Sequence, residues 1–69
     1  MLTNTFTLLK VKNIEKGTIR YYVEQDSGKF IRCSQGIFEY YESIANRTDC
    51  IYNTHKNGVA RFYKTVYCK

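Results

Sequence analysis

The chain has 69 residues and a formal net charge of +5, with 43% hydrophobic and 25% charged residues. This balance is typical of a globular domain and excludes a disordered chain, and the length allows one domain, residues 1–69, near the lower size limit for a self-sufficient core. So short a chain has little room for an enclosed active-site cleft, which favours a protein that binds on its outer surface.

The first strand is predicted at residues 4–14, where apolar side chains occur on both faces of the alternating pattern. A bulge at Leu8 and Leu9 would reconcile the two faces. Residues 15–17 then predict a tight connection, because Gly17 ends the run.

The second and third strands are predicted at residues 18–25 and 29–33. The second alternates one set of side chains, Ile19, Tyr21 and Val23, with another, Arg20, Tyr22 and Glu24. Residues 26–28 read Asp-Ser-Gly, which predicts a hairpin turn because Gly28 can adopt the positive φ that such a turn needs.

The next segment changes to a helical period. Apolar side chains recur on one helical face at Ile37, Phe38, Tyr41, Ile44 and Ala45. Ser34 is the expected N-cap, and Glu39 is expected to suit the positive end of the helix dipole.

Two further strands are predicted at residues 48–54 and 59–68, joined by a hairpin turn at residues 56–58 that contains Asn-Gly. The predicted order is therefore β-β-β-α-β-β. The fold class is a single α+β domain, with one helix packed on one face of a mostly antiparallel sheet of four or five strands.

One helix can cover only one face of such a sheet. The covered face is expected to carry Ile19, Tyr21, Val23, Ile31, Ala60, Phe62 and Val66, in contact with Ile37, Tyr41 and Ile44 of the helix. The uncovered face is expected to carry Lys10, Lys12, Arg20, Tyr22, Phe30, Arg32, Arg61, Tyr63 and Tyr67. Together with Lys64 these residues form the predicted binding site, because aromatic rings beside cations can stack on bases, meet phosphates or anchor an acidic protein partner.

The placement of charge along the sequence agrees with this site. Residues 34–50 hold three acids against one arginine, a net charge of −2, whereas residues 51–69 hold four cations and no acid, a net charge of +4. Residues 1–33 supply the other +3 of the total of +5. The sheet is therefore expected to be basic and the helix acidic, which would steer an anionic partner toward the sheet.

Two other interpretations of the same face stay open. Exposed Tyr, Arg and Lys are ordinary on a solvent-facing sheet, since cross-strand pairs of these residues stabilise the sheet by themselves. The face could also be a surface for self-association, which would make the protein a homodimer.

The three cysteines, Cys33, Cys50 and Cys68, have no metal-binding spacing, and free thiols are expected for a protein of the cytoplasm. If one pair forms a disulfide, Cys33 with Cys50 is the favoured pair, because Cys68 lies near a terminus. No metal or other cofactor is expected. The apolar runs are too short to cross a membrane, and the N-terminus does not resemble a signal peptide, so a cytoplasmic location without a membrane partner is predicted.

The sequence argues against an enzyme. His55 is expected beside a turn, without a nucleophile or carboxylate at a useful spacing, and Ser27 is explained by its turn. Glycine-rich phosphate-binding motifs are also missing from the sequence.

Two binding functions follow from these patterns. In the first, the protein is an inhibitor or adaptor that docks on a larger host protein or nucleoprotein complex. In the second, it binds nucleic acid directly, with Tyr22, Phe30, Tyr63 or Tyr67 stacking on bases and the cations on phosphates, although the signatures of known RNA-binding sheets are missing.

In size and element order, and in basic strands such as residues 20–22 and 61–64, the chain resembles small phage-encoded proteins, in particular compact anti-CRISPR inhibitors. The resemblance rests on no diagnostic motif and implies no site residue. It implies a partner, a CRISPR effector or its nucleic acid, and action in the cytoplasm of the host cell. Because the chain is basic, such an inhibitor is expected to bind an acidic protein patch or to hold nucleic acid unproductively.

Overall fold

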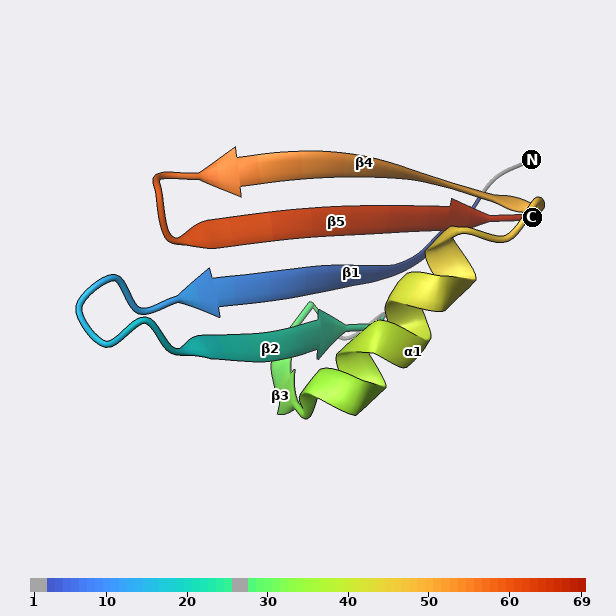
Figure 1. Cartoon of the computed structure of the whole chain (residues 1–69). Coiled ribbons are helices and arrows are strands. Elements are labelled where there is room, and N and C mark those ends of the chain that lie inside the picture. The colour runs from blue at the N-terminus through green and yellow to red at the C-terminus, as the bar shows by residue number, and fades with distance from the viewer. Residues whose placement is uncertain (1–2, 26–27) are drawn as a thin grey trace.

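A computed structural model describes residues 3–25 and 28–69 and contains one helix and one five-stranded antiparallel sheet (Figure 1). The predicted α+β class and element order are confirmed. The predicted turn at residues 26–28 lies partly outside the described residues. The elements are β1 (Thr3–Lys12), β2 (Ile19–Glu24), β3 (Ile31–Cys33), α1 (Gln35–Ala45), β4 (Cys50–Asn57) and β5 (Arg61–Cys68).

The sheet has the strand order β3-β2-β1-β5-β4, so β1 is central and β3 and β4 form the two edges. The helix crosses one face of the sheet and lies over one end of it, which leaves the hairpin turns at the other end uncovered (Figure 1). We call the side of the sheet that carries α1 the helix side.

The central position of β1 explains why its sequence is apolar on both faces. Phe6 and Leu8 are buried on the helix side, each 1% exposed, and Leu9 is buried on the opposite side at 6% exposure. The ladder with β5 shifts register between Asn4 and Phe6, and pairing then runs without interruption through Leu8 and Leu9. The predicted bulge at Leu8 and Leu9 is therefore wrong.

Two glycines with positive φ close the hairpins at the uncovered end. In the β1–β2 connection the Asn13 side-chain oxygen accepts from the backbone N–H groups of Glu15 and Lys16, at 3.1 and 3.0 Å, and Gly17 follows with φ 70°. Between β4 and β5, Gly58 has φ 71°. Strand β4 ends at Asn57, three residues later than predicted, because its pairing with β5 continues to that residue.

The helix begins where the sequence predicts, since the Ser34 hydroxyl accepts from the backbone N–H of Ile37 at 3.2 Å. Glu39 lies beyond the first turn and accepts from Gln35 at 3.1 Å, so its expected role at the helix dipole is wrong. The prediction that Ile37 packs on the sheet is also wrong, because its side chain is 49% exposed.

The core lies between the helix and the sheet. Its buried residues are Phe6, Leu8, Phe38, Ala45, Cys50 and Val66. Aromatic contacts join the layers: the ring centroids of Phe6 and Tyr41 are 5.2 Å apart, and those of Tyr21 and Phe38 are 4.8 Å apart. The core is thus centred at the disulfide end of the sheet, whereas Ile19 and Ile31, expected on the covered face, are 42% and 64% exposed.

A disulfide joins Cys50 to Cys68, which face each other across β4 and β5 with 4.1 Å between their Cα atoms. Cys33 is the free cysteine. The expectation of free thiols is therefore wrong for Cys50 and Cys68, and so is the favoured pair of Cys33 with Cys50. With this disulfide, the cysteines do not support the predicted location in a reducing compartment.

Candidate binding surface

The pairing register assigns every strand side chain to one of two faces, because successive residues alternate. We call the side away from α1 the open face. It carries the predicted site residues Arg20, Tyr22, Phe30, Arg32, Arg61, Tyr63 and Tyr67, together with Leu9 and His55.

A single cross-strand row forms the middle of the open face. It runs from one edge of the sheet to the other through Arg32, Tyr22, Leu9, Tyr63 and His55. Five strands at about 4.8 Å spacing make this row roughly 19 Å long. The next row places Arg20 and Arg61 on either side of Val11.

Phe30 approaches this row from outside the sheet. It precedes β3, and its ring lies edge-on to Tyr63 at 5.9 Å between centroids. Figure 1 shows the chain before β3 passing behind β2, on the side away from the helix. Leu9, in the same row as Tyr63, is 6% exposed although no helix covers this face, and Phe30 keeps 39% of its surface exposed.

The arginines of the open face have no partners among the described residues. Arg20, Arg32 and Arg61 are exposed, and their side chains make no ion pair or hydrogen bond there. Glu24 is the one acid that the strand register assigns to this face, so three guanidinium groups against one carboxylate give a net charge of +2. The face therefore has unpaired cations beside half-buried tyrosine rings.

The placement of Lys10 and Lys12 on the uncovered face is wrong. With the alternation of β1 unbroken, both share the helix side with Phe6 and Leu8, and so does Lys64. The Lys10 ammonium lies 5.6 Å from the centre of the Phe38 ring. The predicted ten-residue site is thus divided between two faces, with the arginines on one and the lysines on the other.

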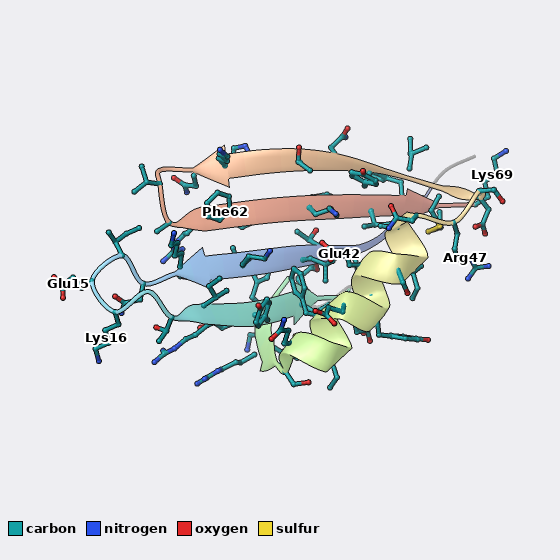
Figure 2. The ribbon with its side chains drawn as sticks, in the orientation of Figure 1. Glu15, Lys16, Glu42, Arg47, Phe62 and Lys69 are labelled. Carbon is teal, nitrogen blue, oxygen red and sulfur yellow. A yellow bond between two sulfur atoms is a disulfide. The ribbon has the colours of Figure 1, made fainter. Side chains whose placement is uncertain are left out.

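Two further lysines on the helix side, Lys64 and Lys56, contact side chains of the fold. Lys64 donates to Glu42 of α1 at 3.2 Å and lies 4.6 Å above the Tyr52 ring. Lys56 lies 5.5 Å from the ring of Phe62, which Figure 2 places on β5 away from the helix. These contacts engage the ammonium groups within the fold.

Sequence reasoning missed His55 and Leu9 as members of the open face. His55 lies in β4 rather than beside a turn, and its ring centroid is 5.6 Å from that of Tyr63. The alternation of Ile51, Asn53 and His55 would place His55 on the open face, but only if β4 is known to continue past residue 54.

The chemistry available elsewhere is limited. Burial raises the pKa of the Cys33 thiol, so this thiol stays protonated at neutral pH and is a weak nucleophile. The described residues include no group of three or more potential metal ligands and no enclosed pocket. Within residues 3–25 and 28–69, no helix is long and apolar enough to cross a membrane.

Comparison with known proteins gives no match, whether with protein-family models, with curated proteins or with solved structures.

Proposed function

We propose that this protein is a non-enzymatic inhibitor that docks its open face on an acidic surface of a larger protein. The observation that carries the proposal is the cluster of Arg20, Arg32 and Arg61, which have no ion pair among the described residues, beside Tyr22 and Tyr63. Arginine and tyrosine are enriched in protein–protein interfaces and supply many of their hot spots, whereas lysine is depleted there. The separation of arginines from lysines between the two faces gives the open face this composition.

Direct nucleic-acid binding is the alternative, supported by the half-exposed rings of Tyr22 and Tyr63. Two observations favour a protein instead. Lys10, Lys12 and Lys64 lie on the opposite side of the sheet, so a nucleic-acid backbone on the open face would meet the three arginines of its strands without these lysines. Phe30 also packs against Tyr63 in the middle of the face, where stacked bases would lie.

The partner class comes from the resemblance to compact anti-CRISPR inhibitors, and it makes a bacterial defence complex the first target to test. This function would operate in the cytoplasm of the host cell, where thiols are kept reduced. Cys50 and Cys68 would then be free thiols in that compartment, and the domain would have to fold without the disulfide.

The test reverses charge on the open face alone. Arg20→Glu with Arg61→Glu is expected to weaken binding to the target at least about 100-fold, because two interface charges become repulsive. The matched control is Lys12→Glu with Lys16→Glu, which makes the same change of net charge on two exposed residues, one on the helix side and one in the β1–β2 connection. The readouts are inhibition of purified CRISPR effectors in target-DNA cleavage and binding by biolayer interferometry, with circular dichroism to check folding.

Equal inhibition by a folded Arg20→Glu/Arg61→Glu variant would exclude the open face as the binding surface. Binding of labelled oligonucleotides across a series of salt concentrations tests the alternative function, direct nucleic-acid binding. If the open face binds single-stranded nucleic acid, log affinity should fall with log salt at a slope of about −2, as expected for three phosphate contacts. If oligonucleotides do not bind at low salt, nucleic acid is excluded as the target.

A further inference from the structure

Strand β4 is an unprotected edge of the sheet. It is eight residues long, every residue after Cys50 is exposed, and β5 is its one strand partner among the described residues. Natural edge strands are usually short, or carry bulges, prolines or several charges that prevent pairing with another chain. β4 has no proline or glycine, its ladder with β5 shows no register shift, and Lys56 is its one formal charge.

The disulfide identifies which main-chain groups point outward from this edge. A Cα separation of 4.1 Å for Cys50 and Cys68 is that of a non-hydrogen-bonded antiparallel pair. The neighbouring bond agrees, since the Lys69 N–H donates to the Asp49 carbonyl at 3.1 Å. Alternation then directs the N–H and C=O groups of Tyr52, Thr54 and Lys56 away from β5.

We propose that the β4 edge binds β4 of a second copy of this chain, in antiparallel orientation about a two-fold axis at Thr54. This register aligns the outward groups of Tyr52, Thr54 and Lys56 with those of Lys56, Thr54 and Tyr52 of the second copy. The two edges would form about six hydrogen bonds, two for each pair of facing residues. The two copies would then share one continuous ten-stranded sheet.

The side chains of β4 complement each other in this register. Lys56 faces Tyr52 of the second copy on the helix side, where Tyr52 is 44% exposed and already lies beneath the Lys64 ammonium. Lysine above tyrosine is an attractive cation–π pair, and in forming it Lys56 would exchange its contact with the Phe62 ring of its own chain. Thr54 faces Thr54 of the second copy, which is a favourable β-branched pair. The two Lys56 side chains are separated by four residues along the strand, about 13 Å, so they do not face each other.

The helix leaves this edge accessible. Figure 1 shows α1 crossing β2 and β1 toward the disulfide end, where Ala45 of α1 and Cys50 of β4 share the core, and no other described element lies along the outer edge of β4. A two-fold axis through paired antiparallel edges is perpendicular to the sheet, so both helices lie on one side and both open faces on the other. The pairing therefore does not depend on what the open face binds.

An interface made by two strand edges is small, so the association is expected to be weak. Sedimentation equilibrium from about 10 µM to about 1 mM covers the range expected for such small interfaces. Thr54→Pro removes an outward N–H without removing a bond to β5, and proline is tolerated at such edge positions. It is expected to raise the dimer dissociation constant at least about tenfold, whereas Thr54→Ala, which keeps the N–H, is expected to dimerise almost normally.

Hydrogen exchange provides a second measurement that does not need a variant. The amides of Tyr52, Thr54 and Lys56 should exchange fast in dilute protein and become protected at high concentration. Those of Asn53 and His55, which bond to β5, should be protected at both. A monomer throughout the concentration range would overturn the proposal, and so would a dimer that folded Thr54→Pro leaves unchanged.

Discussion

The disulfide between Cys50 and Cys68 should supply a large part of the stability of this domain. The two cysteines are 18 residues apart, and closing a loop of that size in the unfolded chain stabilises the folded state by about 3 kcal/mol. A domain of this length has a total free energy of unfolding of roughly 3–10 kcal/mol. Reduction should therefore lower the melting temperature by roughly 10–25 °C.

Thermal and urea unfolding followed by circular dichroism, with and without a phosphine reductant, measure this contribution. The Cys33→Ala variant is the matched control and should respond to reductant like the wild type, because Cys33 is the free cysteine. The Cys50→Ala/Cys68→Ala variant should show no response. A wild-type shift of only a few degrees, or an equal shift in the double variant, would refute the loop-closure reasoning.

Two further variants test the core and the helix start by urea unfolding. Leu8→Ala is expected to cost about 3 kcal/mol, because the side chain is 1% exposed on the central strand; a cost below about 1 kcal/mol would contradict its place in the core. Ser34→Ala is expected to cost about 1 kcal/mol, since it removes the cap on the Ile37 N–H, whereas Ser34→Asp should retain most of the stability. Equal losses in the two Ser34 variants would contradict the capping role.

The order of the elements could be predicted because their signals are local. The change from alternating to helical period after Cys33, the serine at the helix start and the glycines at the turns each depend on a few neighbouring residues. All of them act within one element or one connection. The structure confirms this part of the prediction.

The faces of β1 could not be predicted because its sequence fits two phases equally well. Phe6 and Leu8 suit a buried face, and so do Leu9 and Val11, since the strand is central and Leu9 is buried on the open face as well. Which phase faces the helix depends on contacts with Phe38 and Val66, which are distant in sequence. The misplacement of Lys10 and Lys12 follows directly from this ambiguity.

The disulfide depends on the register of one hairpin. Asn57 pairs with Arg61, so residues whose numbers sum to 118 face each other, and Cys50 with Cys68 satisfies that sum. The turn predicted at residues 56–58 is centred on residue 57 and sets Cys50 opposite residue 64 instead. The observed turn is centred two residues later than the predicted one. With the predicted turn, Cys50 does not face Cys68, and His55 lies beside the turn rather than in β4.

The open face and the β4 edge use different groups, so the two proposals can fail separately. The open face depends on arginine and tyrosine side chains, whereas the edge depends on the main-chain groups of Tyr52, Thr54 and Lys56. Arg20→Glu/Arg61→Glu should therefore leave the dimer intact, and Thr54→Pro should leave the binding of one open face to one target site intact. Because the dimer presents both open faces on one side, a target with two sites should bind it more tightly through effective concentration, and Thr54→Pro should abolish only that gain.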